Sequence, residues 1–159
     1  MTIVALGINH KTASVELREK VAFSPEQLSE ALQQLSDHDQ FNEAVIVSTC
    51  NRTEIYCSLA QQNSQILLQW LASFHGLDEY ELSSNVYCHQ DNDAINPLIR
   101  VSCGLDSLVL CRTKLLGENK TAFLSIQVSG SIYKNIFFII RSVKFFQLNF
   151  FREFSIAAK

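Results

Sequence analysis

Two strand-like segments joined by a short polar turn constrain the fold of this chain more than any other feature. Residues 44–47 form a β-branched run that is typical of a buried strand. Residues 53–59 alternate apolar with polar side chains, as a half-buried strand does. Only the five residues 48–52 separate the two segments. We therefore expect the segments to pair with each other in a small antiparallel sheet.

The remaining segments predict helices that cover this sheet. We expect strands at residues 3–8 and 85–89, a turn at 9–12, and helices at 15–22, 24–35, 66–74 and 92–103. Ser24, Pro25 and Gln27 form a capping box with proline at the first helical position, a strong signal for a helix start. Pro97 falls inside the last helix or near its first turn. The expected fold class is α+β, a small antiparallel sheet covered by helices.

Cys50 lies in the turn between the paired segments, within the run Ser48-Thr49-Cys50-Asn51-Arg52-Thr53-Glu54. A thiol attacks carbonyl groups only as the thiolate, and a free cysteine has a pKa of about 8.5. Arg52 is always charged and matches a carboxylate with two parallel hydrogen bonds, so it could bind a substrate carboxylate, favour the thiolate, or do both. We interpret the run as an activated nucleophile beside an anion clamp. The alternative is a small buried hydrophobic residue, which free cysteines often are.

Four blocks of the sequence, in the same order, resemble the glutamyl-tRNA reductase family. They are residues 5–13 (Ala-Leu-Gly-Ile-Asn-His-Lys-Thr-Ala), 17–19 (Leu-Arg-Glu), 48–54 with Tyr56, and 104–110 (Gly-Leu-Asp-Ser-Leu-Val-Leu). The resemblance covers residues 1–110 well and the remainder poorly. It implies a ferredoxin-like catalytic domain and the NADPH-dependent reduction of glutamyl-tRNA(Glu) to glutamate-1-semialdehyde. That reaction is the first step of five-carbon tetrapyrrole (porphyrin) synthesis.

The resemblance also implies roles for individual residues. Cys50 attacks the aminoacyl ester and forms a thioester with the glutamyl group, the tRNA leaves, and NADPH reduces the thioester. The positions that hold the glutamyl group are Thr49, Cys50, Asn51, Arg52 and Ser107. His10, in the turn after the first strand, is expected to be a structural hydrogen-bonding residue.

Several departures from the family pattern fall on functional positions. Where the family carries a histidine that assists catalysis, this chain has Pro97, which cannot shuttle a proton. His89 lies eight positions earlier in another element and is not expected to replace that histidine. The other substituted contact positions are Arg112, Thr113, Lys114 and Glu118. We therefore expect an impaired reductase. The alternatives are a non-catalytic remnant that binds at most a protein or tRNA, and, more distantly, a thiol-redox protein.

The composition changes near residue 110. Residues 1–110 carry five basic and fourteen acidic residues, a net charge of −9, whereas residues 111–159 carry eight basic and two acidic residues, a net charge of +6. We expect 1–110 to be the catalytic domain and 111–159 a divergent, Phe-rich basic tail, an eroded linker region. Five glycines without a Gly-x-Gly-x-x-Gly motif predict no NADPH-binding site in this chain. The NADPH-binding and dimerisation domains of the homodimeric family are expected to be absent.

Cysteine usage and apolar runs bear on the compartment. The five cysteines are odd in number and lack metal-ligand spacing, so neither disulfides nor a metal site are expected. The N-terminus lacks a secretory signal. The apolar run 136–140 is far shorter than the roughly 20 residues of a membrane helix. We expect a cytoplasmic protein without membrane contact, whose substrate is glutamyl-tRNA(Glu).

Overall fold

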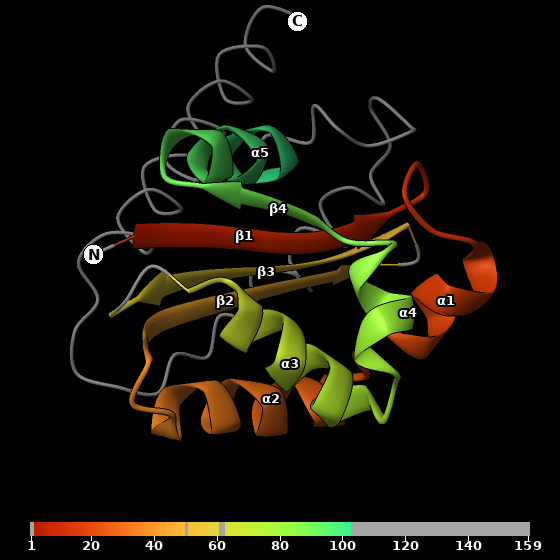
Figure 1. Ribbon diagram of the computed structural model, residues 1–159, viewed down its shortest axis with the longest axis horizontal. Coiled ribbons are helices and arrows are strands. Elements are labelled where there is room, and N and C mark those ends of the chain that lie inside the picture. Colours follow the sequence, from red (N-terminus) through yellow and green to blue (C-terminus); the bar gives the residue numbers. More distant parts are fainter. Residues whose placement is uncertain (1, 50, 61–62, 103–159) are drawn as a thin grey trace, which may run out of the picture.

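The computed structural model describes residues 2–49, 51–60 and 63–102. Its elements are β1 (Thr2–Asn9), α1 (Val15–Lys20), α2 (Pro25–Asp37), β2 (Phe41–Thr49), β3 (Arg52–Leu59), α3 (Gln65–His75), α4 (Glu79–Ser83), β4 (Tyr87–Gln90) and α5 (Asn92–Ser102). The strands form one sheet in the order β2-β3-β1-β4, with every neighbouring pair antiparallel (Figure 1). Two β-α-β units are thus interleaved, which is the ferredoxin-like arrangement. The expected α+β fold is confirmed.

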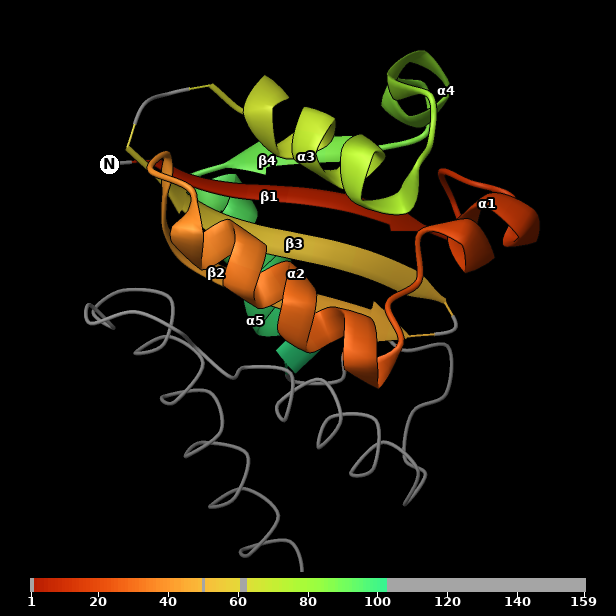
Figure 2. The same ribbon diagram turned by 90° about the horizontal axis from the view of Figure 1, so that it is seen from below.

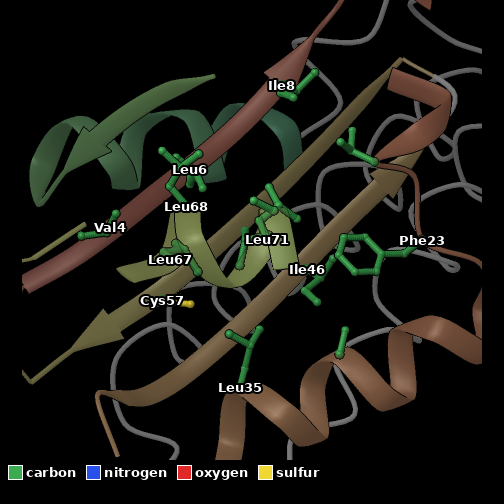
Figure 3. Packing of buried hydrophobic residues seen from close by; sticks show 14 of the residues in the cluster. Val4, Leu6, Ile8, Phe23, Leu35, Ile46, Cys57, Leu67, Leu68 and Leu71 are labelled. Carbon is green, nitrogen blue, oxygen red and sulfur yellow. The ribbon is translucent and has the colours of Figure 1, made fainter. Parts of the chain in front are cut away.

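Helices α2 and α3 cover one face of the sheet (Figures 1 and 2). Apolar residues of α2 recur every three or four positions, at Leu28, Leu32 and Leu35, so they form one stripe facing the strands. They are buried in a single core cluster together with Leu67, Leu68 and Leu71 of α3 and with Val4, Leu6, Ile46, Ile55 and Cys57 of the sheet (Figure 3). This cluster is the main hydrophobic core.

Helix α5 covers the opposite face (Figure 1). Ala94 and Leu98 are buried in a smaller cluster with Ala5, Val45, Val47 and Tyr56 of the sheet. The faces of the sheet are therefore called the core face, under α2 and α3, and the α5 face. Any polar group on the α5 face lies between the strands and α5 or at the edge of that layer.

Asp91 fixes the start of α5 to the first strand. Its backbone N–H donates to the Ile3 carbonyl at 2.7 Å, and its carboxylate accepts from the Ile3 N–H at 3.2 Å. The φ of Asp91 is +48°, in the left-handed region that aspartate tolerates better than most residues. This two-way contact sets where α5 begins above the sheet.

Most element boundaries agree with expectation within a few residues. The capping box is present: the Gln27 N–H donates to Ser24 Oγ at 3.3 Å, and the Ser24 N–H donates to Gln27 Oε1 at 2.9 Å. Strand β2 begins earlier than the apolar run 44–47, and β4 begins at Tyr87 instead of residue 85. The short helix α4 was not expected. Its signal is Asp78, whose carboxylate accepts from the N–H groups of Tyr80 and Glu81.

The described residues also bear on cysteine chemistry and membranes. Cys57 is completely buried in the core, and burial raises the pKa of its thiol, so it is a packing residue. Cys88 is an exposed free thiol on β4. Within these residues no three His, Cys, Asp or Glu side chains gather as a metal site, and no helix is long and apolar enough to cross a membrane. The predicted boundary at residue 110 and the tail lie outside the described residues.

Candidate functional site

The residues around the predicted nucleophile separate onto the two faces of the sheet. Side chains alternate along a strand, so Arg52, Glu54 and Tyr56 of β3 lie on the α5 face, where Tyr56 is buried. Ser48 and Thr53 lie on the core face. Ser48 Oγ accepts from the Phe23 N–H at 3.0 Å and lies 3.4 Å from Thr53 Oγ1. The two hydroxyl groups therefore hold the fold, whereas Arg52 and Glu54 lie on the opposite face of the sheet, the α5 face.

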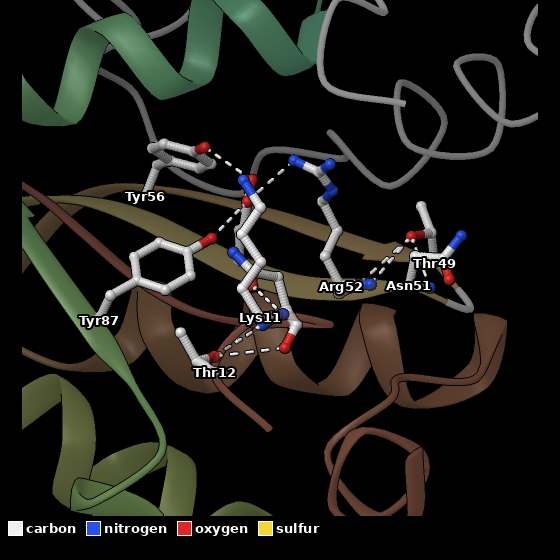
Figure 4. Close-up of polar contacts among 9 residues, drawn as sticks. Lys11, Thr12, Thr49, Asn51, Arg52, Tyr56 and Tyr87 are labelled. Atoms are coloured by element: carbon white, nitrogen blue, oxygen red, sulfur yellow. Dashed lines mark hydrogen bonds and ion pairs between the residues drawn. The ribbon is translucent and has the colours of Figure 1, made fainter. Parts of the chain in front are cut away.

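Thr49 closes the turn between β2 and β3. It pairs with Arg52 in the strand register, so only positions 50 and 51 separate the two paired residues in the sequence. Thr49 Oγ1 accepts from the N–H groups of Asn51 and Arg52, each at 3.3 Å (Figure 4). Cys50 itself lies outside the described residues, as does Ser107. The hydroxyl of Thr49 thus holds the two residues that follow Cys50 in the sequence.

The buried carboxylate of Glu54 forms an ion pair with Arg52. Glu54 is 2% exposed, and its Oε1 lies 3.3 Å from Nη1 of Arg52, whose side chain is 10% exposed. The Tyr56 hydroxyl donates to Glu54 Oε2 at 2.8 Å, and the Tyr87 hydroxyl donates to Glu54 Oε1 at 2.5 Å. In Figure 4 the hydroxyl groups of Tyr56 and Tyr87 and the guanidinium of Arg52 point toward one place, where dashed lines mark these three contacts. An ion pair with so little contact with water requires such additional hydrogen bonds.

Both tyrosines keep their protons at any ordinary pH. Burial raises the pKa of Tyr56 and of Tyr87 well above the usual value of 10, and the negative charge of Glu54 raises them further. The guanidinium of Arg52 opposes this shift, as does a hydrogen bond from the Asn9 side chain to Tyr87, but both effects are smaller. The two hydroxyl groups are therefore permanent donors to the carboxylate.

The structure brings three of the predicted site residues together. Thr49, Asn51 and Arg52 lie at the end of the β2–β3 hairpin. His10 is exposed in the turn after β1. Pro97 is an interior residue of α5, next to the buried Leu98.

His89 lies on the α5 face of β4, away from the hairpin turn. Its ring centroid lies 5.3 Å from that of Tyr87. It pairs with Ala5, whereas Arg52 pairs with Asn9, so the two positions lie about 13 Å apart along the strands.

Sequence reasoning assigned no role to Glu54, Tyr56 or Tyr87. The period of two along β3 is a signal for the first two, because it places Glu54 and Tyr56 on the same face as Arg52. Tyr87 has no such local signal. It comes from β4 and reaches Glu54 only because of the order of strands in the sheet.

The described residues do not fit an NADPH site of the Rossmann type. That type of site binds the pyrophosphate at a glycine-rich turn between a strand and the start of a helix. The two described glycines are Gly7, inside β1, and Gly76, which ends α3 with a φ of +64°. Neither lies at such a turn, so we assign no residue of this part of the chain to the cofactor.

Comparison with known proteins gives one consistent result. A family model described as "Glutamyl-tRNAGlu reductase, N-terminal domain" matches residues 6–143. Among curated relatives, the glutamyl-tRNA reductase of Pseudoalteromonas translucida is 74% identical over 132 residues, which cover 83% of this chain and 32% of that protein. That of Photobacterium profundum is 50% identical over 133 residues, covering 84% of this chain and 32% of the relative.

A solved structure agrees with these matches. Glutamyl-tRNA reductase from Methanopyrus kandleri has a TM-score of 0.65 and 25% identity, covering 89% of this chain and 32% of the other. The chain thus spans about a third of the length of the curated relatives that it matches.

Proposed function

This chain belongs to the glutamyl-tRNA reductase family, and from that membership we propose that it performs the acyl-transfer half of a glutamyl-tRNA reductase reaction. It accepts the glutamyl group of glutamyl-tRNA(Glu) as a thioester on Cys50. Thr49, Asn51, Arg52 and Ser107 hold that group, and residues 1–110 are the catalytic domain. NADPH-dependent reduction to glutamate-1-semialdehyde is proposed for the whole protein and not assigned to the described residues.

The proposed step is a nucleophilic acyl substitution. The Cys50 thiolate attacks the carbonyl carbon of the ester that links glutamate to the terminal ribose of the tRNA. A C–S bond forms and the C–O bond breaks, and its electron pair goes to the ribose oxygen. That oxygen takes a proton from water, because Pro97, at the family's histidine position, has no proton to give. The products are a glutamyl thioester and free tRNA.

The geometry of Arg52 is the observation that supports this function best. Arg52 begins β3, two residues after Cys50, and its guanidinium is held at 3.3 Å from the buried carboxylate of Glu54. A guanidinium binds a carboxylate with two parallel hydrogen bonds. The free side-chain carboxylate of a glutamyl group offers that partner, whereas most other aminoacyl groups do not. Arg52 would therefore select the substrate as well as place it.

Intact-protein mass spectrometry after mixing the chain with glutamyl-tRNA(Glu) tests this proposal. We expect an adduct with the mass of a glutamyl group on the wild-type protein and none on Cys50→Ser. Arg52→Lys keeps the charge but loses the planar fork, so its adduct should form more slowly. A wild-type protein that is folded by circular dichroism and forms no adduct would favour a non-catalytic remnant instead.

A further inference from the structure

Tyr87, Gly7 and Glu54 occupy one row across three neighbouring strands. Gly7 of β1 pairs with Tyr87 of β4 on one side and with Glu54 of β3 on the other. Adjacent strands lie about 4.8 Å apart, so Tyr87 and Glu54 stand almost 10 Å apart at their backbones. A side chain on β4 can reach Glu54 only by passing over the middle strand.

The missing side chain of Gly7 allows this passage. A Cβ placed on Gly7 would lie 2.6 Å from both Cζ and Oη of Tyr87 and 2.9 Å from its Cε2. Real Cβ atoms do not approach other atoms so closely, so the phenol ring occupies the space that any larger residue would fill. Glycine inside a strand weakens it, because it packs no side chain and loses more backbone entropy. Here it permits the contact between Tyr87 and Glu54.

Tyr87 and Arg52 contact the same oxygen of Glu54. Tyr87 donates to Oε1 of Glu54, and Nη1 of Arg52 lies 3.3 Å from the same oxygen. Tyr56 occupies the other oxygen, Oε2, from within β3. The orientation of the carboxylate is therefore set by donors from two different strands, and the guanidinium meets an acceptor that cannot turn freely.

We propose that Tyr87 is a positioning residue for Arg52: it crosses Gly7 to hold Glu54, and Glu54 holds the guanidinium in the orientation that receives the substrate carboxylate. The proposal rests on the proposed function in that Arg52 binds this carboxylate. Tyr87 itself touches no reacting atom. It acts through Glu54 and Arg52, and it affects how well the Arg52 guanidinium is aligned with the substrate carboxylate.

Tyr87→Phe tests the proposal, because it removes the hydroxyl and keeps the ring over Gly7. Tyr80→Phe is the matched control, since Tyr80 is 82% exposed on α4. The first measurement does not depend on catalysis. NMR of the full chain labelled with ¹⁵N-arginine follows the rotation of each guanidinium group. The Arg52 signal is identified as the one that is missing from the spectrum of Arg52→Lys. We expect slow rotation of the Arg52 guanidinium in the wild type and Tyr80→Phe, and fast rotation in Tyr87→Phe.

The second measurement is the glutamyl-tRNA concentration that gives half-maximal adduct formation on Cys50. We expect it to rise about tenfold in Tyr87→Phe, the effect of one lost hydrogen bond to a charged group, while the melting temperature changes little. The proposal would be overturned if Tyr87→Phe changed neither the rotation of the Arg52 guanidinium nor the glutamyl-tRNA concentration for half-maximal adduct formation. It would also be overturned if the melting temperature were the only quantity that changed.

Gly7→Ala provides a second variant, because the added methyl group must displace the phenol. It should reproduce the fast Arg52 rotation. If the wild type forms no adduct, the proposed function fails, but the NMR comparison still decides whether Tyr87 positions Arg52.

Discussion

Arg52 and Glu54 stand two residues apart on the same face of one strand and meet at 3.3 Å, almost completely out of contact with water. The ion pair fixes the guanidinium of Arg52 at the start of β3, two residues after Cys50 in the sequence. Because the carboxylate also accepts from Tyr56 and Tyr87, its removal would affect the fold as well as the site.

Glu54→Gln should lower the free energy of unfolding by about 2 kcal/mol. The amide removes the charge that faces Arg52, and its NH₂ group replaces an oxygen that accepts from a tyrosine. Urea unfolding followed by circular dichroism measures the change. Glu30→Gln, on the exposed side of α2, is the control and should change stability by less than about 0.5 kcal/mol. Equal stabilities of the two variants would contradict a structural role for the buried carboxylate.

Thr49→Val should disturb the turn that contains Cys50. The substitution keeps the shape of the side chain but removes the acceptor of two backbone N–H groups. We expect a loss of about 1 kcal/mol in stability and slower adduct formation on Cys50. Thr49→Ser keeps the hydroxyl and should behave nearly as the wild type. If Thr49→Val formed the adduct as fast as Thr49→Ser, the hydroxyl would have no role in placing the nucleophile.

His75 should make the protein less stable as the pH falls. It packs against Phe23 and Phe74, with ring centroids at 4.6 and 5.1 Å, and burial lowers the pKa of its imidazole below the ordinary 6.5. Below about pH 6.5 the unfolded chain therefore binds a proton that the folded chain does not, so the free energy of unfolding decreases.

Urea unfolding at pH 7.5 and pH 5.5 measures this dependence. His75→Phe should lose less stability between the two pH values than the wild type, because it removes the titrating group and keeps an aromatic ring. His10→Gln, at an exposed turn position, serves as the control and should keep the wild-type difference. The same pH difference in His75→Phe as in the wild type would show that other groups cause it.

Pro97→His should speed adduct formation on Cys50. The resemblance places a catalytic histidine at this position, and a correctly placed acid or base contributes roughly a hundredfold or more in rate. Pro97→Gln is the matched control, because it restores the helical N–H that proline lacks and adds no titratable group. The rate of adduct formation, measured from pH 5.5 to 8, should rise with the thiolate fraction of Cys50 in both variants, and only Pro97→His should show an additional pH dependence from its imidazole. Equal rates in the two variants would contradict the assignment of this position.

The local parts of the fold could be predicted because their causes are local. The capping box at Ser24 and a strand over residues 53–59 need only neighbouring residues, and both are found. The expected half-burial of that strand is wrong, because helices cover both faces of the sheet and bury Glu54 and Tyr56 as well as Ile55 and Cys57. Helix α4 was missed because its five residues have no apolar period long enough to detect, although Asp78 marks its start.

The candidate site divides in the same way. Arg52 and Thr49 could be identified from the turn and from the resemblance, whereas the contact of Tyr87 with Glu54 joins residues 33 positions apart. It depends on β1 lying between β3 and β4 and on the missing side chain of Gly7. Sequence period alone cannot supply that arrangement, because it gives the face of each residue but not its neighbours across the sheet.

Strand β3 divides its residues between the two faces of the sheet, with Ile55 and Cys57 in the main core and the Arg52–Glu54 ion pair on the α5 face. Within the eight residues of β3, the requirements of the main core and of the proposed acyl transfer therefore fall on alternating positions. A library covering every substitution in this strand, sorted once for abundance and once for Cys50 acylation, should show Ile55 and Cys57 restricted by abundance, and Arg52 restricted mainly by acylation. Glu54, which is buried and also holds Arg52, should be restricted in both sorts.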